Sequence, residues 1–159
     1  GASHVFLARL RGGRAELLLQ KRSAQKDSFP GLYDISAAGH LDPGEDFAAA
    51  ARRELAEELG VTGGEAEFLF AQRNEYHGAF HGKPFHDNEI AWVYLLVLDR
   101  PEEAFTPEAC EVESVHWFSV REILRAMREN DPRFCLREAE FCRLLPYLAQ
   151  KFGIPVDKL

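Results

Sequence analysis

The sequence predicts an α/β protein in which helices cover both faces of a mixed β-sheet, giving an α/β/α sandwich. Two observations predict this class. Apolar segments of strand length recur along the chain, and helix-forming segments with their own start and stop signals lie between and after them. The chain has 159 residues, of which 46% are apolar, and no linker or repeat divides it. We therefore expect residues 1–159 to form one domain with a substantial core.

The first half of the chain is expected to contain a hairpin, a short strand and a helix, over residues 4–10, 15–21, 35–38 and 46–59. The glycines of Arg11-Gly12-Gly13-Arg14 provide the hairpin turn. The helix follows the turn signal Asp42-Pro43-Gly44, contains four consecutive alanines and stops at Gly60. Its apolar stripe of Ala48, Ala51, Leu55 and Leu59 should face the core.

The second half is expected to contain three strands and two helices, near 65–74, 89–98, 115–118, 119–129 and 137–152. Residues 89–98 are nearly all apolar, so they should form a central strand buried on both faces. Ser119 and Glu122 form a capping box that opens the first of the two helices, and Pro146 should kink or interrupt the second. Residues 75–88 are polar and read as a substrate-facing loop, with a zinc cluster of His77, His81 and His86 as the alternative.

Charge and cysteine content exclude several classes of function. The net charge of −7 argues against a nonspecific nucleic-acid or anionic-membrane binder. No apolar run approaches 18 residues, so no membrane span is expected, and the first residues lack the features of a signal peptide. The three cysteines lack CxxC spacing. We expect them to be small apolar residues in a cytoplasmic protein.

Three glutamates in the first helix point to metal chemistry. Glu54, Glu57 and Glu58 occupy positions i, i+3 and i+4, which places their carboxylates on one face within a turn. Like charges at this spacing repel one another, and a divalent cation with hard oxygen ligands, Mg²⁺ or Mn²⁺, would relieve the repulsion. A solvated acidic helix face is the alternative.

The same segment resembles the Nudix box, through Gly39, Glu45, Arg53-Glu54-Leu55, Glu57-Glu58 and Gly60-Val61 at the family's spacing. The resemblance implies an α/β/α fold and metal-dependent hydrolysis of a phosphoanhydride. It also implies metal ligands at the Ala38 carbonyl, Glu54, Glu57 and Glu58. The catalytic residues would be Glu54 and Glu57, together with Arg53, which would pair with Glu45 and orient the ligands.

The residue that activates water is less sharply defined by the sequence. The candidates within the box are Glu54 and Glu57, and those downstream are Glu89, Glu111 and Glu113. We favour Glu54 as a metal ligand that also acts as the base. Glu89 is then the metal ligand from outside the box, and Glu113 is expected to be a surface residue.

Further segments resemble the isopentenyl-diphosphate isomerase branch of the Nudix superfamily, namely residues 19–23, 26–40 and 87–90. This resemblance implies that Arg22 and Lys26 bind the diphosphate. It also implies a possible second metal site at His40, Asp87 and Glu89, and His4 matches a further histidine loosely.

One position departs from the isomerase pattern. Ala38 stands where the isomerases carry a proton-transferring cysteine, while the box glutamates are intact. We therefore expect a hydrolase whose substrate is a nucleoside diphosphate linked to another group X, or a similar small organic diphosphate. The alternatives are an isopentenyl-diphosphate isomerase and a non-catalytic diphosphate-binding regulator. No nucleic-acid or membrane partner is expected, and the protein would be a monomer or homodimer.

Overall fold

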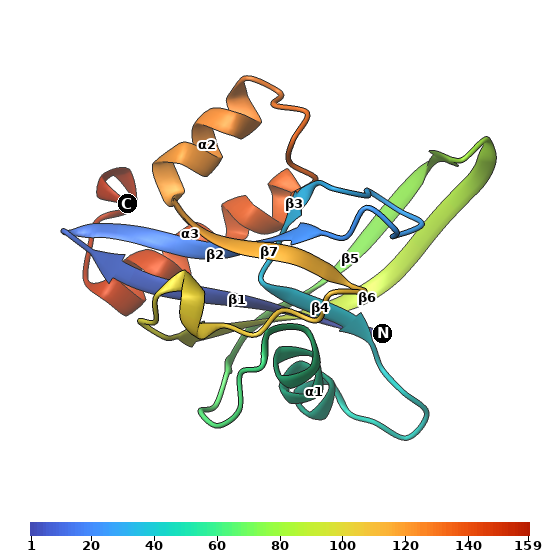
Figure 1. Cartoon of the computed structure of the whole chain (residues 1–159). Coiled ribbons are helices and arrows are strands. Elements are labelled where there is room, and N and C mark those ends of the chain that lie inside the picture. Colours follow the sequence, from blue (N-terminus) through green and yellow to red (C-terminus); the bar gives the residue numbers. More distant parts are fainter.

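A mixed β-sheet forms the centre of the protein, as the sequence predicts (Figure 1). The computed structural model describes the backbone of residues 1–159 and every side chain except those of Phe80 and Asp87. Within this part of the chain the sheet runs in the order β3-β2-β1-β6-β5, with β4 paired to β1 and β7 paired to β2. Strands β1 and β6 are parallel, and the other pairs are antiparallel. The strands are β1 Ala2–Arg11, β2 Arg14–Arg22, β3 Tyr33–Asp34, β4 Ala37–His40, β5 Glu67–Phe80, β6 Lys83–Val97 and β7 Val112–Ser119.

The helices lie on opposite faces of this sheet. On one face α1 (Phe47–Leu59) packs Ala51, Leu55 and Leu59 into a buried cluster with alternate residues of β1 and β6. On the other face α2 (Val120–Arg128) and α3 (Glu138–Phe152) cover a second cluster that includes Ile123 and Leu144. Side chains alternate between the faces of a strand, so a single sheet contributes to both cores. This arrangement confirms the predicted α/β/α sandwich.

The helix boundaries follow the local signals. The Asp46 side chain accepts a hydrogen bond from the Ala49 amide and caps α1, and Gly60 ends it in the left-handed conformation with a φ of 68°. Ser119 and Glu122 form the predicted capping box. A kink or an interruption was expected at Pro146, and the interruption is wrong, because α3 runs through this residue. Proline removes an amide that would reach the carbonyl of Cys142, and that residue is exposed to solvent.

The expected loop over residues 75–88 is also wrong. Strands β5 and β6 stay paired from Glu67↔Leu95 to Phe80↔Lys83, and His81 and Gly82 form the connecting turn. Both turn residues have positive φ, 54° and 74°, which is the conformation of a two-residue hairpin turn. Because β6 pairs with β1 from Ala91 onward, residues 73–90 project beyond the rest of the sheet as a two-stranded arm (Figure 1).

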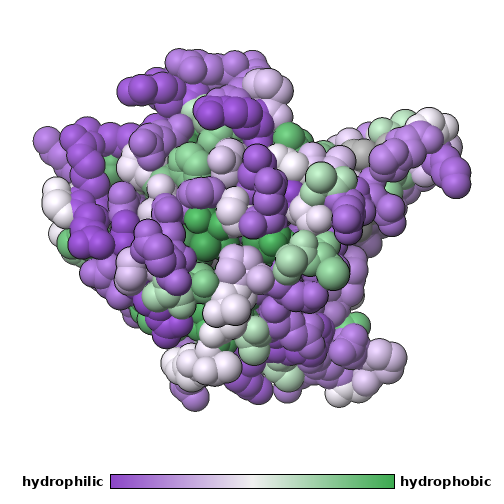
Figure 2. All heavy atoms as spheres, in the orientation of Figure 1, coloured by the Kyte–Doolittle hydropathy of each residue, from purple (hydrophilic) through white to green (hydrophobic). Residues whose placement is uncertain are grey.

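The surface and cysteines complete the description. Hydrophilic residues cover most of the face seen in Figure 2, and apolar residues gather near its centre. No helix among the described residues is long and apolar enough to cross a membrane. Cys110 and Cys142 are exposed, and half-buried Cys135 donates to the Tyr33 carbonyl at 3.3 Å, so none of the three cysteines belongs to the buried core.

Candidate active site

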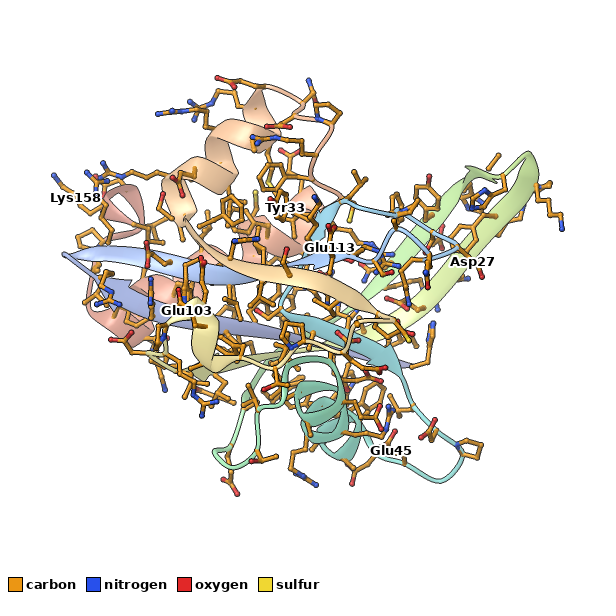
Figure 3. The ribbon with its side chains drawn as sticks, in the orientation of Figure 1. Asp27, Tyr33, Glu45, Glu103, Glu113 and Lys158 are labelled. Carbon is orange, nitrogen blue, oxygen red and sulfur yellow. The ribbon has the colours of Figure 1, made fainter. Side chains whose placement is uncertain are left out.

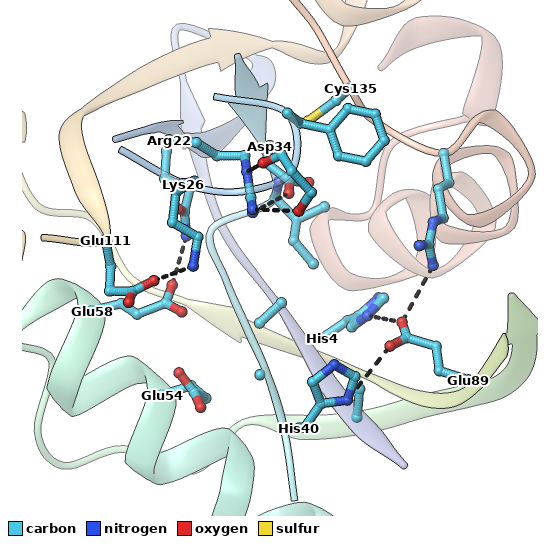
Figure 4. Close-up of a pocket in the computed structure, with 18 of the residues that line it drawn as sticks. His4, Arg22, Lys26, Asp34, His40, Glu54, Glu58, Glu89, Glu111 and Cys135 are labelled. Atoms are coloured by element: carbon cyan, nitrogen blue, oxygen red, sulfur yellow. Dashed lines mark hydrogen bonds and ion pairs between the residues drawn. The ribbon is translucent and has the colours of Figure 1, made fainter. Parts of the chain in front are cut away.

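A cavity of about 850 Å³ opens between α1, the strand β4 and the end of the sheet from which the arm projects (Figure 4). Its lining includes Glu54, Glu57 and Glu58 from α1 and Ala38, Gly39 and His40 from β4. Residues from β1, β2, β3, β5, β6, α3 and the loops between these elements complete it. The cavity therefore brings together the box helix and most of the site residues that the sequence predicts.

Gly39 makes the close approach of β4 and α1 possible. A Cβ atom built on Gly39 would come within 2.8 Å of the Glu54 Cγ and would overlap the Glu54 carboxyl group. Glycine is thus required here for lack of space, and not for an unusual φ. The consequence is that the Glu54 carboxylate lies directly against the β4 backbone.

The three box glutamates differ in their surroundings. Glu54 and Glu58 are buried, whereas 58% of the Glu57 side chain is exposed. Burial, together with the charge of Glu54, raises the pKa of Glu58 to about 8, although Gln20 donates to its carboxylate at 2.6 Å. Glu54 and Glu58 are therefore buried although they lie outside the apolar stripe of α1. The pair is covered by β2 and β4, which the spacing within one helix cannot reveal.

Arg53 joins the loop before α1 to the helix. Its guanidinium donates to Glu45 at 2.9 and 2.8 Å, to Glu54 at 2.6 Å and to the His40 carbonyl at 2.9 Å. Glu45 lies in the loop before α1 (Figure 3), and the hydrogen bonds from Arg53 hold its pKa near 2. The Arg53–Glu45 contact expected from the resemblance is thus present, and it fixes β4, the loop and α1 relative to one another.

The donor set suits a hard divalent cation. The carboxylates of Glu54, Glu57 and Glu58 offer anionic oxygen donors. Burial and the charge of Glu54 raise the Glu58 pKa, and a cation would remove the repulsion between these two carboxylates. Among the described residues no three His, Cys, Asp or Glu side chains are gathered as a metal-binding group. Arg53 contacts both Glu54 and Glu57, and Gln20 contacts Glu58. A cation would therefore have to replace these contacts at the carboxylate oxygens.

A buried ionic network forms the other side of the cavity. His4 on β1 lies between two carboxylates. Its Nε2 is 2.9 Å from Glu89 (Figure 4), and its Nδ1 is 2.8 Å from Glu140. Burial opposes charge on His4, but the two carboxylates outweigh it and raise its pKa to about 10. Burial likewise opposes charge on Glu89, yet the hydrogen bond from His4, aided by Arg137 at 3.3 Å, lowers its pKa to about 2.

Sequence reasoning missed two members of this network, namely Arg137, which directly precedes α3, and Glu140, which lies within α3. The sequence offered only a weak signal, because Glu140 is a carboxylate next to Phe141 in the apolar stripe of α3. In the structure Glu140 is only 2% exposed. The second metal site implied by the resemblance includes His40, which is exposed and has its Nδ1 3.9 Å from a carboxylate oxygen of Glu89. The side chain of Asp87 lies outside the described residues.

The predicted phosphate-binding residues line the cavity but have protein partners. Arg22 pairs with Asp34 at 3.2 Å and also donates to the Ser28 carbonyl, and Lys26 pairs with Glu111. Of the downstream base candidates, Glu89 and Glu111 reach the cavity. Glu113 pairs with Lys21 at 3.4 Å on the surface, as predicted (Figure 3).

Comparisons with known proteins agree with this architecture. The family model described as NUDIX domain matches residues 2–138. Nudix hydrolase 3 of Arabidopsis thaliana is 40% identical over 150 residues, covering 89% of this chain and 19% of that protein. An isopentenyl-diphosphate Delta-isomerase of Cereibacter sphaeroides is 31% identical over 135 residues, covering 84% of this chain and 73% of the isomerase.

Solved structures give the same fold at lower identity. An Ap4A hydrolase of C. elegans aligns with a TM-score of 0.63 and 21% identity, covering 96% of this chain and 98% of that one. The NUDIX domain of Shewanella oneidensis NrtR, complexed with ADP ribose, aligns with a TM-score of 0.60 and 21% identity, covering 78% of this chain and 75% of the NrtR domain.

Proposed function

The chain belongs to the Nudix family of hydrolases, and from this premise we propose that it cleaves a phosphoanhydride bond in a small organic diphosphate, with Mg²⁺ or Mn²⁺ as cofactor. A nucleoside diphosphate linked to another group X is the proposed substrate class. The observation that carries the proposal is the close approach of Gly39 to the Glu54 carboxylate, with Glu57 and Glu58 lining the same cavity. A binding function alone would not require a buried pair of repelling carboxylates.

Each predicted residue has a role in this proposal. The ligands of the cation would be the Ala38 carbonyl, Glu54, Glu57, Glu58 and Glu89. A divalent cation at these oxygens would neutralise the substrate's charge and lower the pKa of a bound water molecule. Glu54 would accept a proton from that water, and Arg53 would position Glu54 through the hydrogen bond at 2.6 Å.

The phosphate groups would be bound by Arg22 and Lys26. Both line the cavity, and each would exchange a carboxylate partner, Asp34 or Glu111, for a substrate phosphate. A second cation at His40, Asp87 and Glu89 remains part of the proposal. The short separation of His40 and Glu89, 3.9 Å, supports it.

Isomerisation of isopentenyl diphosphate is the second candidate, because several relatives at 31–32% identity carry that name. Ala38 lines the cavity at the position where the resemblance places a cysteine, and its methyl group has no proton to transfer. Cys135 also lines the cavity, but burial raises the pKa of its thiol, which disfavours the thiolate. Hydrolysis is therefore favoured. We also propose that residues 1–159 act as one catalytic unit, as a monomer or homodimer in the cytoplasm.

A substrate panel tests this function. Purified protein with Mg²⁺ or Mn²⁺ would be incubated with nucleoside diphosphate derivatives and isopentenyl diphosphate, and phosphate release and dimethylallyl diphosphate would be measured. We expect hydrolysis of at least one nucleotide, and a loss of activity when the cation is chelated. Formation of dimethylallyl diphosphate would support the isomerase. Binding without turnover across the panel would support a non-catalytic regulator.

A matched pair of variants connects activity to the site. Glu57→Gln removes a carboxylate that lines the cavity, and it should lower kcat by about 10- to 100-fold. Glu113→Gln removes a similarly exposed carboxylate on β7, with 53% exposure against 58% for Glu57, and should leave kcat unchanged. Equal effects of the two substitutions would contradict the proposed site.

A further inference from the structure

Two histidines lie directly opposite each other on the arm. His77 on β5 pairs with His86 on β6, and directly opposed residues of two paired strands place their side chains side by side on one face. Both residues are exposed, so solutes have access to their rings. The ring centroids are 4.9 Å apart with planes inclined by 65°, and the two Nδ1 atoms face one another at 2.7 Å.

This contact has the geometry that two imidazole groups need in order to chelate a cation. Lone pairs on two nitrogen atoms this close would repel each other, so either a shared proton or a cation lies between them. Two nitrogen ligands of one Zn²⁺ ion, each about 2.0–2.1 Å from the metal, stand roughly 2.9–3.4 Å apart. Small rotations of the two exposed rings would therefore open the present separation far enough to admit the ion.

The ligand type selects the class of cation. Neutral imidazole suits Zn²⁺, Cu²⁺ and Ni²⁺, whereas Mg²⁺ prefers oxygen ligands. Among the described residues no three His, Cys, Asp or Glu side chains gather as a metal-binding group, so water would complete the coordination of a two-histidine site. The next pair along the ribbon, Glu75 and Asn88, is exposed on the same face and offers further oxygen donors.

The pair is separate from the other candidate metal ligands of this region. His81 lies in the turn, four residues beyond His77, which corresponds to about 13 Å along an extended strand. The cluster of His77, His81 and His86 that the sequence left open is therefore not formed. His86 lines the cavity, but it is three residues from Glu89 on β6, so the two side chains leave opposite faces of the strand.

We propose that His77 and His86 bind a divalent transition-metal cation, such as Zn²⁺, that fastens β5 to β6. Within the described sheet, residues 73–90 pair only with each other (Figure 1), and a two-stranded ribbon is marginally stable in water. A metal ion held by two directly opposed residues would act as a cross-link and would fix the register of the ribbon. This inference goes beyond the proposed hydrolysis and does not depend on it.

Calorimetric titration of the whole chain with Zn²⁺ tests the site. An excess of Mg²⁺ would be present throughout, because Mg²⁺ competes for carboxylate oxygens and not for imidazole nitrogens. We expect a Zn²⁺ site that remains under these conditions and that His77→Gln and His86→Gln each weaken about tenfold or more, since even the loss of an outer-shell partner costs about 10- to 100-fold. Both positions are exposed, so neither substitution should disturb folding.

Two further histidine variants serve as matched controls. His81→Asn keeps a residue that tolerates the positive φ of 54° in the turn, and His40→Gln removes the exposed histidine beside Glu89. Both should leave the Zn²⁺ affinity within about twofold of the wild type. An affinity that depends on His81 or His40, and not on the opposed pair, would overturn the proposal.

Amide hydrogen exchange followed by mass spectrometry tests the cross-link itself. A ligand that binds only the closed arm slows exchange through its opening by about 100-fold when its free concentration is 100 times Kd. We expect slower exchange in peptides from residues 73–90 on addition of Zn²⁺ to the wild type, and no change in the His77→Gln/His86→Gln double variant. Zn²⁺ binding that leaves exchange of the arm unchanged, or that persists in the double variant, would refute the site.

Discussion

The contact between Gly39 and Glu54 depends on a single missing methyl group. Gly39→Ala would drive the Glu54 side chain away from β4, and Glu54 is already held by Arg53. We expect kcat to fall by at least about tenfold, because the displaced carboxylate belongs to the proposed metal site. The measurement is the steady-state rate on the substrate found in the panel, with circular dichroism as a check of folding.

A second substitution makes this expectation specific. Glu54→Asp shortens the side chain by one methylene group and reduces the overlap with an alanine at position 39. The two substitutions should therefore be non-additive in thermal stability, with the double variant more stable than the sum of the single effects implies. Additive effects would show that the close approach does not constrain Glu54.

At the scale of single residues, spacing along the sequence identified much of the candidate site. Glu54, Glu57 and Glu58 lie within one helix, so the helix period alone places these residues near one another. Gly39 lies on β4, and only the resemblance to the Nudix box connected it with them. Burial of Glu54 and Glu58 could not be predicted in this way, because it depends on β2 and β4. Glu140 was missed for the same reason, since its partner His4 is 136 residues away.

At the scale of elements, α3 is joined to β1 by an ion pair that predicts a pH dependence. The folded pKa of His4, about 10, is above its ordinary value of 6.5, so the folded state binds this proton more tightly. The stabilisation is therefore fully present below pH 6.5 and is lost as the pH rises toward 10. On the order of 5 kcal/mol of unfolding free energy should disappear over this interval.

Urea unfolding of the metal-free protein between pH 6 and 10 measures this loss. His4→Gln removes one titrating group and should reduce the dependence, leaving the part that comes from Glu58, whose pKa of about 8 lies in the same interval. Glu140→Gln should reduce it less, because one of the two carboxylates around His4 remains. A wild-type slope equal to that of His4→Gln would mean that His4 is not charged in the folded state.

The elements also show where sequence patterns are informative. Helix α1 was predicted within a residue because its cap, its alanines and its terminal glycine all agree. The arm was missed because a two-stranded ribbon lacks the apolar alternation of a half-buried strand, and its histidines and glycines resemble a loop. The turn at His81-Gly82 was the available signal.

At the scale of the whole molecule, two cores share one sheet and should unfold together. Leu55→Ala on the α1 side should cost about 2–5 kcal/mol, and Ile123→Val on the α2 side about 0.5–1.5 kcal/mol. Because the residues lie on opposite faces, the double variant should show the sum within about 0.5 kcal/mol. Urea titrations followed by both far-ultraviolet and near-ultraviolet circular dichroism measure these values, and two separate transitions would contradict a single folding unit.

The arm has a consequence for how this protein can change. Its turn at His81-Gly82 is exposed and far from both cores, so added or deleted residue pairs there would alter neither the register of β1 with β6 nor the contacts of α1. The same change would lengthen or shorten the ribbon that carries Tyr76 and Phe85 beside the cavity. The reach of the ligand site can thus be altered independently of the stability of the fold, which makes this turn a natural place for insertions, reporter peptides and directed evolution of specificity.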